Sequence, residues 1–134
     1  MIKVYIASKL AYAEQFRGYR EAWKNEGIDL HARWFDQAII EQTSEVHLND
    51  FHIFWLVDEE DVKNSDAVIV YGTERDKLKG ALVEAGIAIA MGKLVIIIGD
   101  CPDFGTWQHH PLVTRAGSFE HAKTMILRRF RWPA

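Results

Sequence analysis

The sequence is poor in cysteine, in long apolar runs and in net charge. Its single cysteine, Cys101, cannot form a disulfide within the chain, and the N-terminal residues enter a strand-like pattern without the layout of a signal peptide. All apolar runs are far shorter than the roughly 20 residues that a membrane-spanning helix needs. These absences argue against a disulfide-stabilised or membrane-spanning protein and favour a cytoplasmic one.

Charge gives no reason to expect a polyanionic partner. The net charge is −3 and the sequence pI is about 6.0, so neither long nucleic acid nor an anionic membrane is attracted. The basic and aromatic stretch Arg128–Trp132 is more typical of a surface or an oligomer contact than of a nucleic-acid site. With 49% apolar and 12% aromatic residues, the 134 residues suffice for a single folded domain, 1–134.

Strand-like and helix-like segments alternate along the chain. Apolar runs rich in β-branched residues predict five strands, at Ile2–Ala7, Ile28–Phe35, Ala67–Tyr71, Leu94–Ile98 and Leu112–Arg115. The third and fourth runs are continuously apolar, which is typical of parallel strands buried on both faces. The pattern predicts an α/β fold, a flavodoxin- or Rossmann-like three-layer sandwich with a mostly parallel sheet of about five strands.

Several helices are predicted between these strands. The first carries a stripe that faces the sheet, with Ser8 as its cap and Gly27 at its end; the stripe consists of Tyr12, Phe16, Tyr19 and Trp23. Another helix runs from Thr43 or Ser44 to about Lys63, and the last one from Ser118 through Glu120–Phe130.

The predicted helix that ends near Lys63 has an apolar side and an acidic stretch. Its apolar side consists of Leu48, Phe51, Phe54, Trp55 and Val62. The acidic residues 58–61 are interpreted as a solvated face, although Asp58 stands where it can also serve a site at the sheet edge.

One carboxylate needs an explanation. Glu84 lies in an apolar, small-residue helix, one to two turns beyond the end of the third strand. Ligands of such sheets bind beyond the carboxyl ends of the strands, so Tyr5–Leu10, Tyr71–Gly80 and Gly99–His110 should share one rim that Glu84 can reach. Apolar surroundings should raise the pKa of this carboxyl unless a donor stabilises its charge.

Common site types do not fit the sequence. Gly72 and Thr73 lack the spacing of the dinucleotide fingerprint and of the phosphate loop. The histidines lack the spacing of a metal site, and Cys101 has no activating context. We therefore expect neither a metal nor a cofactor.

Three segments in this order carry a family resemblance. They are Val4-Tyr5-Ile6-Ala7-Ser8, the segment from Asp58 to Ser65-Asp66-Ala67-Val68-Ile69, and Glu84-Ala-Gly86-Ile-Ala88 followed by Gly92-Lys93-Leu-Val95. Together they resemble the nucleoside 2-deoxyribosyltransferase superfamily, which also contains deoxynucleoside-monophosphate N-glycosidases. The resemblance covers most of the chain.

The resemblance implies a function and a set of site residues. Glu84 would be the nucleophile that attacks the anomeric carbon of a ribose or deoxyribose, Tyr5 would orient it, and Asp66 would lie near the leaving base. The substrate, a nucleoside or nucleoside 5′-monophosphate, would be bound by Ser8, Asp58, Gly72, Thr73, Asp76, Lys79 and Gly80. The family also implies a homo-oligomer.

The sequence departs from the family pattern near the sugar. The family usually has Asp or Ser six residues before the glutamate, whereas this chain has Leu78, for which Asp76 or Thr73 of the loop can substitute. Leu82 likewise replaces a common glycine. The cations Arg75, Lys77 and Lys79 suit a 5′-phosphate at the helix N-terminus, and equally suit a solvated loop.

Two other hypotheses remain, and so does the choice between base transfer and hydrolysis. In one, the chain is a non-catalytic nucleotide-sensing domain in which Glu84 binds a ribose hydroxyl. In the other it is a structural or oligomerisation module in which Glu84 pairs with a basic side chain across a subunit interface.

Overall fold

Five parallel strands form one sheet in the computed structural model, which describes residues 1–37 and 48–131. The strand order is β2-β1-β3-β4-β5, and every neighbouring pair is parallel. The strands are β1 (Ile2–Ala7), β2 (Ile28–Leu30), β3 (Ala67–Tyr71), β4 (Leu94–Ile98) and β5 (Val113–Ala116). This arrangement confirms the predicted α/β class.

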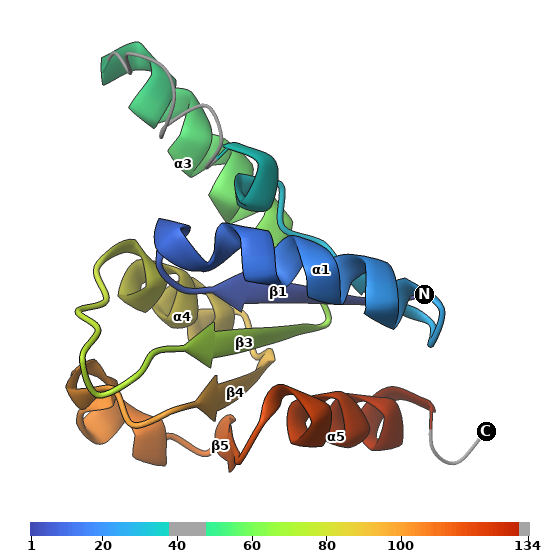
Figure 1. Ribbon diagram of the computed structural model, residues 1–134. Coiled ribbons are helices and arrows are strands. Elements are labelled where there is room, and N and C mark those ends of the chain that lie inside the picture. The colour runs from blue at the N-terminus through green and yellow to red at the C-terminus, as the bar shows by residue number, and fades with distance from the viewer. Residues whose placement is uncertain (38–47, 132–134) are drawn as a thin grey trace.

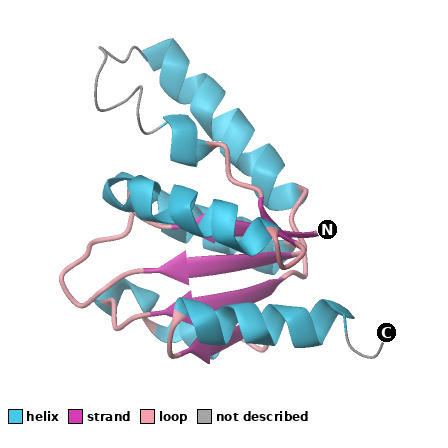
Figure 2. Ribbon diagram, turned by 45° about the vertical axis from the view of Figure 1, so that its right-hand side comes forward, coloured by secondary structure: helices cyan, strands magenta, loops and turns pink. Residues whose placement is uncertain are grey.

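Helices cover both faces of the sheet (Figures 1 and 2). On one side lie α1 and α5, where the ring centroids of Tyr19 and Phe119 are 4.9 Å apart, and on the other side α4 contacts β1, β3 and β4. The C-terminal half of α3 packs beside α4, and its N-terminal half extends past the sheet (Figure 1). The helices are α1 (Ala13–Lys24), α3 (Leu48–Lys63), α4 (Gly80–Ala90) and α5 (Phe119–Arg131), with short 3₁₀ helices η1 (Leu10–Tyr12), η2 (Pro102–Phe104) and η3 (Thr106–His109).

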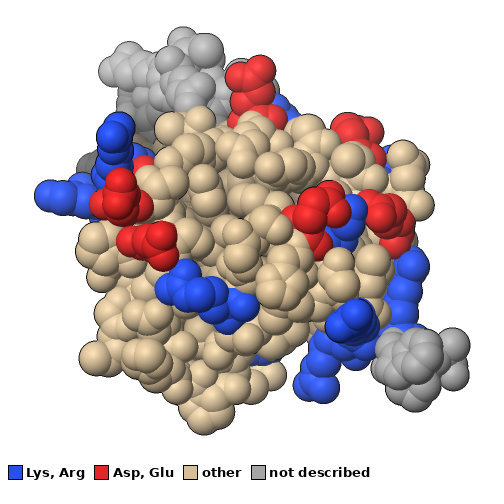
Figure 3. All heavy atoms as spheres, turned by 60° about the horizontal axis from the view of Figure 1, so that its bottom comes forward, with Lys and Arg blue, Asp and Glu red and all other residues tan. Residues whose placement is uncertain are grey.

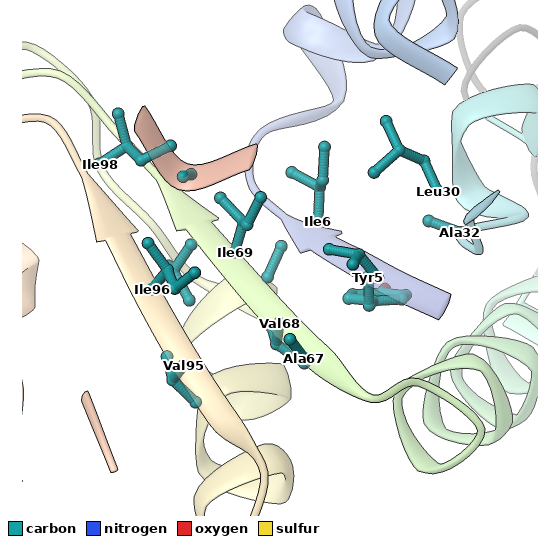
Figure 4. Close-up of a cluster of buried hydrophobic side chains, with 14 of the residues drawn as sticks. Tyr5, Ile6, Leu30, Ala32, Ala67, Val68, Ile69, Val95, Ile96 and Ile98 are labelled. Atoms are coloured by element: carbon teal, nitrogen blue, oxygen red, sulfur yellow. The ribbon is translucent and has the colours of Figure 1, made fainter. Parts of the chain in front are cut away.

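The core lies on the three inner strands, β1, β3 and β4. Val68 and Ile69 of β3, and Val95 and Ile96 of β4, are fully buried (Figure 4). Continuous apolar runs therefore correspond to strands covered on both faces, as predicted.

The first helix has the predicted inner stripe. Phe16 and Trp23 are buried, while Tyr12 and Tyr19 pack against the core. Gly27 ends this segment with φ 84°, a left-handed conformation that glycine adopts without steric cost.

The start of α1 differs from the prediction. Ser8 does not cap it; its hydroxyl donates to the Tyr71 carbonyl, 2.7 Å away, and so ties β1 to β3. The chain first forms η1, and α1 begins only at Ala13, with Tyr12 at the N-cap position and no side-chain cap.

The second strand is shorter than predicted. It ends at Leu30, whereas Ile28–Phe35 was expected, and residues 34–37 are helical. Trp34 and Phe35 are buried although they lie outside the sheet, and the Trp34 indole donates to the Ile6 carbonyl at 2.7 Å. Burial of this short helical segment produced the same apolar pattern as a strand.

The helix α3 also differs in part. The predicted start at Thr43 or Ser44 lies outside the described residues. Val62 is buried as expected, but Phe51 and Trp55 are 46% and 42% exposed because this half of α3 lies beyond the sheet. Within the described ranges, no helix has the length and hydropathy needed to span a bilayer.

Candidate active site

A crevice opens where the strand order reverses, between the carboxyl ends of β1 and β3. In sheets of this order, ligands bind at this switch point. Its volume is about 630 Å³, and its walls come from the exit of β1, the loop after β2, the side of α3 and the start of α4. Glu84 lies among its lining residues.

The fold turns Glu84 inward. Its neighbours on the same side of α4 are Ala81, Ala85 and Ala88, all buried, whose small side chains let the helix lie close to β1 and β3. Glu84 is 5% exposed, and the Tyr5 hydroxyl donates a hydrogen bond to its carboxylate. The hypothesis of an ion pair across a subunit interface does not fit this buried, intramolecular partner.

The environment makes Glu84 a weak acid. Burial raises the pKa of Glu84 to about 8; the hydrogen bond from Tyr5 opposes this rise, and the negative charges of Asp58 and Asp61 add to it. Burial, followed by the nearby Glu84 charge, raises the pKa of Tyr5 well above its usual value. Tyr5 therefore remains a hydrogen-bond donor while Glu84 changes its charge near neutral pH.

The acidic stretch of α3 has two different environments. Glu59 and Glu60 have side chains 44% and 64% exposed, as a solvated face requires. Asp58 lines the crevice, and Asp61 is fully buried against Arg33. The prediction of a solvated acidic face is therefore wrong for Asp61, because a cation distant in sequence pairs with it.

Cations and aromatic rings form the mouth and the wall of the crevice. Lys9, Lys77 and Lys79 line it, whereas Arg75 does not. The aromatic wall consists of Trp34, Phe51, Phe54 and Trp55. Such a site offers positive charge to an anionic group and flat apolar surface to a ring.

The structure brings together six of the predicted site residues. Glu84 and Tyr5 are hydrogen-bonded to each other. Four further residues line the crevice around them: Ser8, Asp58, Lys79 and Gly80. Gly80 lies beneath Trp55, where an added Cβ would stand 3.2 Å from the indole. Because Gly80 has no side chain, the Trp55 indole can pack directly against the start of α4.

Asp66 lies elsewhere. It precedes β3 at the amino edge of the sheet, is exposed, and accepts a hydrogen bond from the Lys3 backbone N–H at 2.8 Å. A five-residue strand at about 3.3 Å per residue separates it from the crevice. The carboxylate from the preceding segment that does line the crevice is Asp58.

Asp76 and Thr73 belong to the loop between β3 and α4, behind the crevice. Asp76 is 7% exposed and accepts from the Thr73 N–H and hydroxyl at 2.8 and 3.0 Å, from the Tyr12 hydroxyl at 2.7 Å and from Lys9 at 3.3 Å. Burial alone would raise its pKa, but these donors lower the pKa of Asp76 to about 2. The Asp76 carboxylate therefore accepts hydrogen bonds that hold the loop in place.

Gly72 and Leu78 are packing residues. An added Cβ at Gly72 would stand 2.9 Å from the Cys101 side chain. Leu78 is 5% exposed, and its N–H donates to Asp103 at 2.7 Å. Although Leu78 touches the crevice, it offers an apolar surface where the family pattern has a polar side chain.

Three residues of this region, Lys9, Trp34 and Asp61, were not predicted from the sequence. Lys9 falls within the predicted rim after β1, so its position was a usable signal. The sequence contains no comparable signal for Trp34 and Asp61, because the turn after β2 brings Trp34 to the crevice and Arg33 to Asp61. Among residues 1–37 and 48–131, no group of three or more His, Cys, Asp or Glu side chains is arranged to hold a metal ion.

Comparison with known proteins identifies a similar fold. No family model and no curated protein matches the sequence. Among solved structures, the CMP N-glycosidase BcmB of Clostridium botulinum is similar, with a TM-score of 0.55, 14% sequence identity, and coverage of 92% of this chain and 96% of that one. This likeness extends over nearly the whole of both chains and shows that they share the α/β, Rossmann-like fold.

Proposed function

We propose that this protein cleaves or transfers the N-glycosidic bond of a nucleoside or nucleoside 5′-monophosphate. The observation that carries the proposal is the buried Glu84 carboxylate, bonded to Tyr5 and lining the crevice at the switch point. The similar fold of a CMP N-glycosidase supports it.

Glu84 is the nucleophile in this proposal. Its carboxylate oxygen forms a bond to the anomeric carbon while the bond from that carbon to the base nitrogen breaks, and the base leaves with a proton. We assign the supply of that proton to Asp58, because it is the second carboxylate that lines the crevice. Water, or the nitrogen of an acceptor base, then attacks the same carbon and frees Glu84.

The remaining walls suit the other parts of a nucleotide. Lys77 and Lys79 offer positive charge at the start of α4, where the helix dipole also favours an anion. Lys9 lines the crevice from the exit of β1, where it is paired with Asp76. This arrangement favours a 5′-monophosphate over an uncharged nucleoside. The aromatic wall gives the base a stacking surface.

Chromatography of free base tests the proposal. The protein is incubated with a panel of nucleosides and 5′-monophosphates, with and without an acceptor base, and base release or exchange is followed. We expect release from at least one substrate, and a loss of roughly a thousandfold or more in Glu84→Gln. The matched control is Glu59→Gln, the same change at a half-exposed position of α3.

Two outcomes contradict the proposal. If no substrate of the panel releases its base, the enzyme hypothesis fails, and saturable nucleotide binding without release supports the sensing domain instead. If Glu84→Gln retains turnover, the nucleophile lies elsewhere.

A further inference from the structure

An ion pair outside the proposed chemistry lies directly behind the crevice wall. Asp61 of α3 is fully buried and accepts from three groups of one residue, Arg33: the backbone N–H at 2.9 Å, Nε at 3.0 Å and Nη2 at 2.9 Å. The Arg33 side chain is 51% exposed. A carboxylate inside the fold is thus neutralised by a guanidinium that remains partly in water.

The position of Asp61 links this pair to the active site. It follows Asp58 by three residues, so both carboxylates lie on the same side of α3. The negative charge of each acts on Glu84 and on Tyr5. Asp58 lines the crevice, whereas Asp61 is closed off from it by its burial and its partner.

We propose that Arg33 is a positioning residue of the active site: by neutralising Asp61, it lowers the electrostatic cost of charging Glu84, and a nucleophile requires that charged form. A bare Asp61 would be a second buried negative charge beside Glu84. The kinetic consequence rests on the proposed function; the electrostatic effect on Glu84 does not.

Other charged groups surround the pair. His31 lies 3.6 Å from Asp61 and 3.7 Å from Asp29, and carries charge only when protonated. Glu60 lies 3.3 Å from the Arg33 guanidinium. None of these side chains is replaced in the variants below.

Further charged groups surround Glu84 itself. Tyr5 reaches it from β1 and Asp58 acts on it from α3, while Lys77 and Lys79 line the crevice at the start of α4. These groups are also unchanged in every variant compared. Differences between variants therefore report on Arg33 and Asp61.

A purely mechanical role is the rival explanation. Arg33 precedes Trp34, which lines the crevice, so loss of the ion pair in any way would disturb that wall. Arg33→Met and Asp61→Asn break the same pair but change the local charge in opposite directions. A mechanical role predicts similar effects from both, whereas the electrostatic role predicts opposite ones.

The test follows Glu84 directly by carbon-13 NMR of labelled glutamate carboxyls, with Glu84→Gln identifying the signal. Relative to wild type, we expect the apparent pKa of Glu84 to rise by on the order of one unit in Arg33→Met and to fall in Asp61→Asn. The double variant should return near wild type, and Arg33→Lys, which keeps the charge, should stay close to it. If turnover is observed, the acidic limb of kcat/KM should move in the same order.

The proposal is overturned if the apparent pKa of Glu84 shifts in the same direction in Arg33→Met and Asp61→Asn, or if it shifts in neither. Circular dichroism shows which variants fold. If Arg33→Met does not fold, the comparison uses the other two variants. A lower apparent pKa of Glu84 in Asp61→Asn, with no matching decrease in Arg33→Lys, then supports the proposal, and any other result overturns it. Because the titration needs no substrate, failure of the glycosidase hypothesis would leave this result readable.

Discussion

Glu84 links the stability of the fold to pH. The pKa of its carboxyl is about 8 in the folded chain against an ordinary value of 4.5, mainly because of burial. Folding therefore takes up a proton between these values, so the contribution of Glu84 to the free energy of unfolding is full below about pH 4.5. It falls as the pH rises towards about 8, by roughly 2–5 kcal/mol in all.

Glu84→Gln should remove this dependence. We expect wild type to lose more stability than Glu84→Gln between about pH 5 and about pH 9, since the amide does not titrate. Urea unfolding at both pH values measures the difference, and the other titrating groups are common to both proteins. Parallel losses in the two proteins would show that Glu84 does not titrate across this range.

Asp76 should matter for the loop that walls the crevice rather than for the chemistry. Asp76→Asn loses the charge that holds Thr73, Tyr12 and Lys9, and we expect it to lower the free energy of unfolding by about 1–3 kcal/mol. Urea unfolding measures the loss. The control is Asp100→Asn, whose side chain is 90% exposed and should change stability by less than about 0.5 kcal/mol. Equal effects of the two changes would remove the loop-anchoring role.

The individual site residues were unequally predictable from the sequence. Glu84 stood out because a carboxylate in an apolar helix demands a partner, and Tyr5 is that partner. Asp66 was assigned to the site by the family resemblance alone, although it precedes β3 and ligands of such sheets bind beyond the carboxyl ends of the strands. Asp61 was missed because Arg33 lies 28 residues away in the sequence.

At the scale of elements, parallel strands and the first helix were predictable because their patterns are long and regular. The predicted bounds of β3 and β4 match the structure residue for residue, and the aromatic stripe of α1 packs on the core as predicted. β2 was overestimated because Trp34 and Phe35 are buried outside the sheet. Periodicity reports burial, and it does not report whether a neighbouring strand supplies the hydrogen bonds.

Substitutions of two glycines, Gly86 in α4 and Gly99 after β4, test how closely the chain packs around them. An added Cβ at Gly86 meets nothing within 4 Å, so Gly86→Ala should stabilise the chain by about 0.5–1 kcal/mol through helix propensity. Thermal or urea unfolding measures the change. A loss of stability would mean that a partner, absent from the isolated chain, packs against this position.

Gly99, at the end of β4, should respond in the opposite way. It has φ 97°, and an added Cβ would collide with the Gly72 carbonyl oxygen. We expect Gly99→Ala to lower the free energy of unfolding by roughly 2–4 kcal/mol, measured in the same assay. A neutral effect would show that the turns after β3 and β4 can move apart.

At the scale of the whole molecule, charge is scattered. On the face shown in Figure 3, acidic and basic side chains form small mixed groups around a broad uncharged area. With a net charge of −3, no long-range field favours a polyanion. The cations at the mouth of the crevice therefore act locally, on a ligand already within reach.

Apolar exposure is concentrated on α3 and α4. Ile53 and Leu56 of α3 are 54% and 55% exposed, and Val83 of α4 is 53% exposed. We expect the chain to self-associate through these helices, and Leu56→Lys to shift it towards monomer in sedimentation velocity. Phe130→Lys, on α5 and 39% exposed, is the control. A protein that is monomeric at all concentrations, or an assembly that only Phe130→Lys disrupts, would contradict this expectation.

The edge of the sheet opposite the crevice brings the two ends of the described chain together. Gly27 accepts a hydrogen bond from the Ile2 N–H at 3.0 Å, and the Arg131 guanidinium lies against the same glycine. A bead, a fluorophore or a fused reporter attached beside either residue therefore projects away from the mouth of the crevice. Surface-immobilised protein should keep its crevice open to solution, so that ligand capture can be followed on a chip without a tag obstructing entry.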